Sequence, residues 1–178
     1  MEEDDDGMTT RTASAPEIAP AANIAVQEAI EFIWVEADLL DRRAYREWLD
    51  LWDETGLYII PIERDAADYA AHLNVAYDDA EMRQARVKRL SSGFSMSARA
   101  SARTVRTVSR FVVDERGENW IALRCAQHLA EYKNDRVLVH AADVDYRLTR
   151  ADGALRIARK VIRMINSDDA FVGVGYLF

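Results

Sequence analysis

The sequence is short of the residues that metal centres and disulfide scaffolds require. Its 178 residues include one cysteine, Cys125, and three histidines, so neither an internal disulfide nor a four-cysteine zinc site can form. With 7 glycines and 3 prolines, the composition is neither collagen-like nor linker-like. The single cysteine favours a reducing compartment, and we expect a cytoplasmic location.

Long apolar runs and excess positive charge are also missing. No stretch approaches the roughly 18 consecutive apolar residues of a membrane span, and the N-terminus lacks the basic and apolar regions of a secretory signal. The formal net charge is −8, which opposes binding to nucleic acid or to an anionic membrane. We therefore expect neither as a partner.

The first 22 residues differ in composition from the rest. Five consecutive acidic residues lead into a run rich in Thr, Ala, Ser and Pro, which buries too little apolar surface to offset the entropy of ordering. We expect a flexible acidic, Ala-rich tail over 1–22, either solvated or docked on a partner. Residues 23–178 are expected to form a single domain.

Periodicity divides that domain into helices followed by strands. Apolar residues recur every three or four positions in the first half and alternate in the second. The expected helices are 23–40 with Asn23 as cap, 41–56 with Asp41 as cap, and 79–90 after Asp78 and Asp79. The expected strands are 57–62, 104–113, 120–132, 137–149 and 155–165, with turns at 134–135 and 151–153; residues 63–77 have no clear period.

This order predicts an α+β fold, in which the N-terminal helices cover one face of a curved antiparallel sheet. The last strand is apolar on both faces, so both should be covered, one by helices and the other by a second protein. One face would carry Leu155, Ile157, Val161 and Ile165, and the other Ala158, Ile162 and Met164.

A metal site would have to use nearly all of the histidines, His72, His128 and His140. A two-residue turn between the two central strands places His128 opposite Ala141 and His140 opposite Leu129, so their side chains point to opposite faces. A one-residue bulge would bring them side by side. We expect hydrogen-bonded strand histidines, and no catalytic, cofactor-binding or metal-binding residue.

An acid–base enzyme on this fold is the alternative. Asp143 and Asp145 share a strand face, and Tyr58 and Tyr77 could supply phenols, as an autonomous isomerase or dehydratase would need. A small-molecule-binding domain is a further alternative. Nothing in the spacing brings these groups together, and an interior filled by its own aromatic side chains would exclude the enzyme. A solvated or ion-paired sheet face is the simpler interpretation of the two aspartates.

A series of short segments runs in a familiar order over about residues 24–178. The segments are Glu36–Leu49, Leu57–Pro61, Tyr77–Asp79, Arg86–Leu90, Ser101–Ser109, Tyr146–Leu148, Asp152-Gly153, Leu155–Lys160 and Tyr176–Phe178. Together they resemble the small (β) subunits of aromatic-ring-hydroxylating dioxygenases. Residues 48–53 and 165–167 look closer to the benzoate- and toluate-type members than to others.

The resemblance implies a cone-shaped fold of the nuclear-transport-factor-2-like (NTF2-like) type and a hexamer of three large and three small subunits (α3β3). It places the Rieske [2Fe–2S] cluster and the mononuclear iron in the large (alpha) subunit, with electrons from a reductase or ferredoxin. The parent reaction is cis-dihydroxylation of an aromatic ring. One cysteine and three histidines could not supply those centres.

The chain would then be a non-catalytic assembly subunit with a surface too apolar for a monomer. As interface residues we expect Arg103, Arg106 and Phe178. Replacing Arg103 or Arg106 by Ala should weaken assembly.

Overall fold

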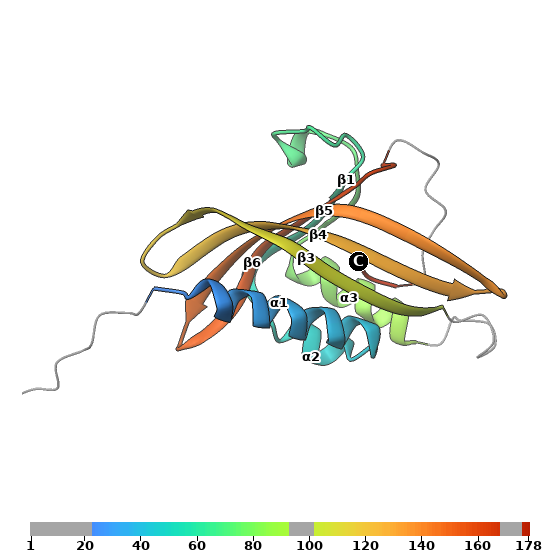
Figure 1. Ribbon diagram of the computed structural model, residues 1–178, viewed down its shortest axis with the longest axis horizontal. Coiled ribbons are helices and arrows are strands. Elements are labelled where there is room, and N and C mark those ends of the chain that lie inside the picture. Colours follow the sequence, from blue (N-terminus) through green and yellow to red (C-terminus); the bar gives the residue numbers. More distant parts are fainter. Residues whose placement is uncertain (1–22, 93–101, 168–175) are drawn as a thin grey trace, which may run out of the picture.

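The computed structural model describes residues 23–92, 102–167 and 176–178; the expected tail lies outside them. Within these described residues, three helices lie on one side of a six-stranded sheet (Figure 1). The helices are α1 (Val26–Asp41), α2 (Tyr45–Leu49) and α3 (Ala80–Ser91), with a 3-10 turn η1 (Tyr69–Ala71). The strands are β1 (Trp52–Pro61), β2 (Asn74–Asp78), β3 (Arg103–Arg116), β4 (Trp120–Lys133), β5 (Arg136–Ala151) and β6 (Ala154–Met164).

The strand order is β2-β1-β6-β5-β4-β3. Strand β1 is parallel to β6, and the other neighbours are antiparallel. Because the helices before β3 pack on one face of a sheet built mostly from the second half of the chain, the expected α+β architecture is confirmed.

The expected second helix is largely wrong. Helix α2 ends at Leu49, and strand β1 begins at Trp52. The predicted helix, in contrast, extended to Gly56. The backbone oxygen of Leu51 accepts a 2.8 Å hydrogen bond from the amide of Ile157, so pairing with β6 outweighs the local helical spacing. The caps also differ from expectation, since Ala25 precedes α1 and Ala44 precedes α2.

The segment without a clear period contains strand β2, which its sequence pattern did not predict. Its five residues pair with the end of β1, with Tyr58 opposite Asp78. So short a strand cannot establish an alternation of its own. The third helix is confirmed, and Asp79 caps it by accepting a 2.9 Å hydrogen bond from the amide of Met82.

The turn between β4 and β5 sets the register of the central strands. Asn134 and Asp135 have φ values of 51° and 58°, the left-handed pair that a tight two-residue hairpin requires. His128 pairs with Ala141 and His140 with Leu129, so the predicted register is confirmed.

Along β6, the side chains that face the core change from odd-numbered to even-numbered residues. The register shifts between Ile157 and Arg159, which leaves Ala158 as an extra residue. Beyond this bulge Lys160, Ile162 and Met164 are buried opposite core residues of β5, whereas Val161 pairs with Asp145. The expected division of β6 into two faces is therefore wrong after Ile157, because a bulge reverses the alternation.

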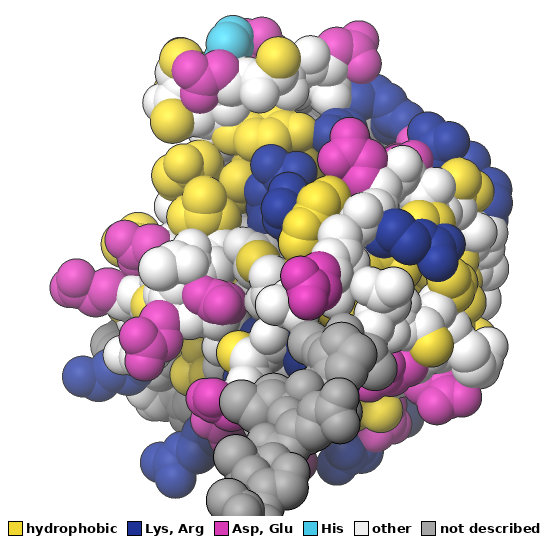
Figure 2. Space-filling view, turned by 90° about the vertical axis from the view of Figure 1, so that its left-hand side faces the viewer, with side chains coloured by type: hydrophobic (Ala, Val, Ile, Leu, Met, Phe, Trp, Pro, Cys, Tyr) yellow, Lys and Arg dark blue, Asp and Glu magenta, His cyan; other side chains and the backbone are white. Residues whose placement is uncertain are grey.

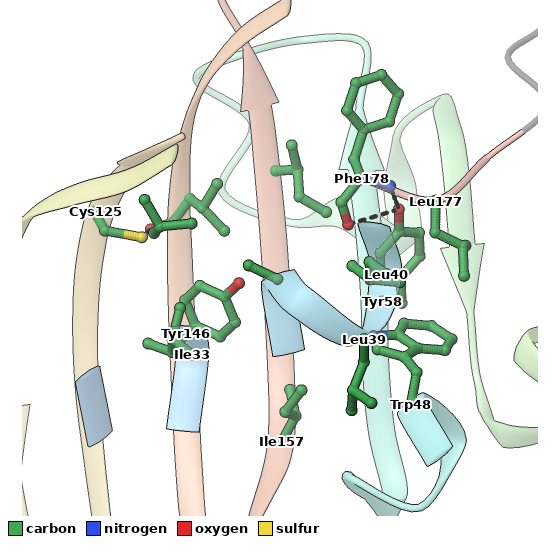
Figure 3. Packing of buried hydrophobic residues seen from close by; sticks show 14 of the residues in the cluster. Ile33, Leu39, Leu40, Trp48, Tyr58, Cys125, Tyr146, Ile157, Leu177 and Phe178 are labelled. Atoms are coloured by element: carbon green, nitrogen blue, oxygen red, sulfur yellow. Dashed lines mark hydrogen bonds between the residues drawn. The ribbon is translucent and has the colours of Figure 1, made fainter. Parts of the chain in front are cut away.

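The core fills the space between the sheet and the helices (Figure 3). Trp48 and Tyr58 lie edge to face with ring centroids 5.9 Å apart, and Trp52 lies 5.3 Å from Trp48 in the same way. Cys125 is also buried there, and burial raises the pKa of its thiol to about 12, so it packs as a small apolar residue.

Candidate functional site

The interior contains a carboxylate that the helix places among apolar side chains. Glu36 lies three residues after Ile33 and four before Leu40, so the helical repeat turns it toward the core, where it is 1% exposed. Its Oε2 accepts a 2.6 Å hydrogen bond from the hydroxyl of Tyr146. Its Oε1 accepts bonds from the Lys160 ammonium at 2.9 Å and the Trp48 indole at 3.0 Å.

Burial controls the ionisation of the groups around Glu36. Burial raises the pKa of Tyr146 well above its usual value, and the adjacent Glu36 raises it further. Burial lowers the pKa of Lys160, and the attraction of Glu36 opposes that change. The tyrosine thus stays protonated, and Glu36 and Lys160 form an ion pair with satisfied hydrogen bonds.

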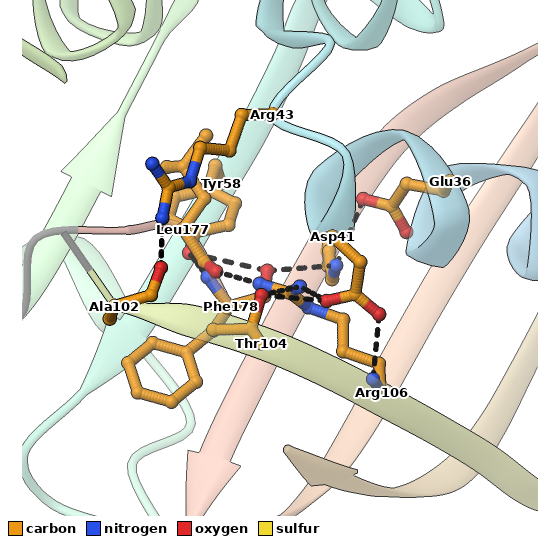
Figure 4. Close-up of polar contacts among 10 residues, drawn as sticks. Glu36, Asp41, Arg43, Tyr58, Ala102, Thr104, Arg106, Leu177 and Phe178 are labelled. Carbon is orange, nitrogen blue, oxygen red and sulfur yellow. Dashed lines mark hydrogen bonds and ion pairs between the residues drawn. The ribbon is translucent and has the colours of Figure 1, made fainter. Parts of the chain in front are cut away.

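Residues 177 and 178 enter the same interior (Figure 4). The Phe178 amide donates to the Tyr58 hydroxyl at 3.0 Å, and the Phe178 carbonyl oxygen accepts from Lys160 at 3.0 Å. Arg106 donates to the Leu177 carbonyl and forms an ion pair with Asp41, the residue expected to cap the second helix. These contacts fasten the end of the described chain to β1, β3 and β6, and Arg106 connects it in turn to α1.

The interior brings a carboxylate and a tyrosine together, but both already bind protein groups. Three donors occupy Glu36, while the buried rings of Trp48 and Tyr58 pack together next to it and the Phe178 ring fills the interior against His140. The cluster can stabilise the fold, whereas proton abstraction would need a substrate within hydrogen-bonding reach of the carboxylate. This is the filled interior that argues against an acid–base enzyme.

The groups considered for acid–base chemistry are not brought together. Tyr58 is inside, whereas Asp143 and Asp145 face a hollow of about 540 Å³ on the opposite, outer face of the sheet. Four arginines and four aspartates line this hollow, and its charges pair across it: Asp143 with Arg64 and Arg110, Asp145 with Arg163, and Asp114 with Arg124. The expected ion-paired role of the two aspartates is confirmed.

The three histidines lie in three different places. His72 follows η1, His128 is exposed on the outer face, and His140 faces Glu131 in the interior at 3.4 Å. Within residues 23–92, 102–167 and 176–178, no group of three or more His, Cys, Asp or Glu side chains could hold a metal ion.

The residues expected at interfaces have different surroundings. Arg106 and Phe178 are buried within this chain, 8% and 1% exposed. Arg103 is exposed, and its guanidinium lies 4.7 Å from the centre of the Tyr132 ring on the outer sheet face.

The pairing of Glu36 with Lys160 was not predicted, although each of the two positions stands out in the sequence. Each is a charged residue at a position that the local apolar period assigns to the core. Because a buried charge is costly unless it is paired, each of these positions predicts a buried partner of opposite charge, but not which residue that partner is.

Comparison with solved structures identifies the fold. The β subunit of benzoate 1,2-dioxygenase from Burkholderia mallei matches with a TM-score of 0.73 at 19% identity, over 86% of this chain and 98% of that one. An NTF2-like protein from Novosphingobium aromaticivorans matches with a TM-score of 0.55 at 14% identity, over 79% and 81%. The protein is therefore of the NTF2-like α+β class.

Sequence comparison identifies the family. A model of the family described as "Ring hydroxylating beta subunit" matches residues 35–168, more than half of the chain. The chain belongs to this family of ring-hydroxylating β subunits, as its sequence resemblance indicated.

Two of the curated relatives are dioxygenase subunits. The small subunit of 2-halobenzoate 1,2-dioxygenase from Burkholderia cepacia is 28% identical over 144 residues, which is 78% of this chain and 87% of that protein. The β subunit of biphenyl 2,3-dioxygenase from Rhodococcus jostii is 28% identical over 116 residues, 61% and 62% of the two chains. Among the helices of the described chain, none is long and apolar enough to cross a membrane.

Proposed function

We propose that this chain is a non-catalytic structural subunit that stabilises an α3β3 oxygenase with a large subunit carrying the Rieske cluster and the mononuclear iron. A reductase or ferredoxin would deliver electrons to that large subunit in the cytoplasm. The substrate would be an aromatic carboxylate, since relatives act in benzoate and 2-halobenzoate dioxygenases. The reaction would add both atoms of oxygen to the ring.

The filled interior is the observation that carries this proposal. In an NTF2-like enzyme a substrate would occupy the cone, but here Trp48, Tyr58 and Phe178 occupy it and Glu36 is saturated by protein donors. The role of the chain would then be structural, because its buried contacts would stabilise the surface that binds a partner. Arg103, at the surface, would contact a partner directly, whereas Arg106 and Phe178 would act by fixing residues beneath it.

Co-expression with the large subunit tests the proposal. We expect the chain alone to be colourless and iron-free, and the co-expressed pair to be a brown complex that contains iron and both chains. The large subunit without this chain should give less soluble, less active oxygenase. A large subunit that assembles and turns over substrate equally well without this chain would overturn the proposal.

A further inference from the structure

The acidic run Glu2–Asp6 at the start of the sequence has no part in the proposed function. It consists of five consecutive carboxylates, out of 31 acidic residues in the whole chain. Runs of like charge repel internally and are typical of segments that bind an oppositely charged surface. A surface that binds this run would have to present cationic side chains that lack carboxylate partners of their own.

The outer face of the sheet presents two such cations, on β5 and β6. Arg147 of β5 lies directly opposite Arg159 of β6 in the antiparallel ladder. Their neighbours Tyr146 and Lys160 are buried in the interior, so both arginines point to the outer face. Like charges in directly opposite positions destabilise a sheet, and an anion bound between them would remove that repulsion. We call Arg147 and Arg159 the opposed arginines.

Other arginines on the same face are already neutralised. Arg163 forms an ion pair with Asp145, and Arg124 forms one with Asp114. Within the described part of the chain, in contrast, neither of the opposed arginines forms an ion pair. Glu115, the acid in the same row of the sheet, is on β3, two strands away from β5. The opposed arginines therefore remain open to an anion.

Packing holds one of the opposed arginines in place. The guanidinium of Arg147 lies 3.9 Å from the centre of the Trp120 ring. Trp120 is fixed in turn by Gly117, whose amide donates a 2.9 Å hydrogen bond to the Trp120 carbonyl oxygen. A Cβ on Gly117 would lie 2.3 Å from the indole nitrogen, so the turn packs closely against the ring. A guanidinium held on a ring keeps its N–H donors available, and its planar fork matches a carboxylate.

The described chain begins beside the opposed arginines. Glu28, in the first turn of α1, accepts hydrogen bonds of 2.6 and 2.8 Å from Arg150. Arg150 is three residues beyond Arg147 on β5, about 10 Å along the strand. Figure 2 faces this end of the molecule, where basic side chains gather at the upper right. Residues 7–22 connect the acidic run to this point and span at most about 55 Å, so the run can reach the opposed arginines of its own chain.

We propose that the acidic run Glu2–Asp6 docks on the opposed arginines of the same chain, with its carboxylates accepting hydrogen bonds from both guanidiniums. Such charge-assisted pairs are roughly twice as strong as neutral hydrogen bonds. Tethering raises the effective concentration of the run to about the millimolar range, which favours it over a free anion or the run of another copy. This inference goes beyond the proposed function and does not rest on it.

Electron paramagnetic resonance of a spin label at residue 7 tests this inference on the full chain. Gly7→Cys supplies a thiol next to the acidic run, whereas Cys125 is buried with a raised thiol pKa and stays unlabelled. The label should move slowly at about 10 mM salt and several times faster at about 1 M salt, where the Debye length is about 3 Å. Equally fast motion under both conditions would overturn the inference.

Charge variants locate the surface that binds the run. Arg147→Gln combined with Arg159→Gln should make the label move several times faster at low salt. Arg46→Gln combined with Arg89→Gln is the matched control, because these two arginines are exposed on α2 and α3; it should leave the slow motion unchanged. Equal effects of the two double variants would mean unspecific attraction and would contradict the inference. Circular dichroism melting verifies that each variant is folded.

Neutralising the run itself gives a test that leaves the described fold untouched. Replacing the acids of Glu2–Asp6 by Gln and Asn changes no described residue, and it should give the fast motion at low salt. Docking within one chain is independent of protein concentration. A label that moves faster on dilution would show that the run binds another copy, and docking in the same chain would then be wrong.

Discussion

Glu36 of α1 and Lys160 of β6 form an ion pair 2.9 Å long, in which each side chain is 1% exposed. The pair joins α1 to β6 across the centre of the molecule. Its hydrogen bonds to Tyr146, Trp48 and Phe178 compensate for part of the loss of water.

Removing one member of this pair should cost more than removing both charges. Lys160→Met leaves the Glu36 carboxylate buried without its cation, and we expect a loss of about 3–5 kcal/mol in the free energy of unfolding. The double variant Lys160→Met with Glu36→Gln should recover much of that loss. Urea unfolding of the single and double variants measures both values; equal losses would show that the charges are not coupled.

The protein should lose stability steeply above about pH 10.5. Burial raises the pKa of Tyr58 and Tyr146, so the unfolded chain releases these protons near pH 10 while the folded chain keeps them. Each retained proton lowers the free energy of unfolding by about 1.4 kcal/mol per pH unit. The pKa of Lys160 is lowered, so this group makes the free energy of unfolding rise with pH. That effect ends at about pH 10.4, where the lysine of the unfolded chain also loses its proton.

Urea unfolding between pH 8 and pH 11 measures this slope. Tyr146→Phe should be less stable at neutral pH, because Glu36 loses a donor, yet its alkaline slope should be smaller by about 1.4 kcal/mol per pH unit. An unchanged slope in this variant would mean that Tyr146 ionises in the folded protein.

Gly56→Ala should destabilise the protein more than Gly153→Ala. A Cβ at Gly56 would lie 2.6 Å from the backbone oxygen of Ile157 and would push β1 away from β6, which we expect to cost about 1–3 kcal/mol. Gly153 has a φ of 79° and open space around it, so Ala there meets only backbone strain. Thermal unfolding of both variants decides the order; a reversed order would contradict the close approach at Gly56.

Arg103→Ala and Arg106→Ala should both weaken assembly, but through different steps. Arg106 pairs with Asp41 inside the chain, so Arg106→Ala should also lower the melting temperature of the isolated subunit. Arg103 is exposed, so its replacement should leave that temperature unchanged. Native mass of the co-expressed complex, together with melting of the subunit alone, separates the two effects. An unchanged hexamer mass in both variants would remove these residues from the interface.

Local patterns predicted the elements that depend on local chemistry. The hairpin at Asn134 and Asp135 follows from backbone preferences of adjacent residues, so its register could be predicted. The start of β1 at Trp52 could not, because it depends on pairing with Ile157 more than a hundred positions away. The bulge at Ala158 likewise has no sequence signal of its own.

The candidate site was harder to predict than the fold. The sequence indicated that chemistry-bearing side chains were few, and family resemblance supplied the role of the subunit. The sequence did not indicate that Glu36 and Lys160 would meet. The two residues are 124 positions apart, and they come together only because α1 packs against β6.

The buried contacts of residues 177 and 178 have a consequence for synthesis on the ribosome. Arg106 and Lys160 lie in the interior, and their carbonyl partners are translated 71 and 18 residues after them. In a nascent chain that ends before Leu177, the buried Arg106 and Lys160 side chains would lack these two carbonyl acceptors. These two buried hydrogen bonds can therefore form only after residues 177 and 178 have been synthesised.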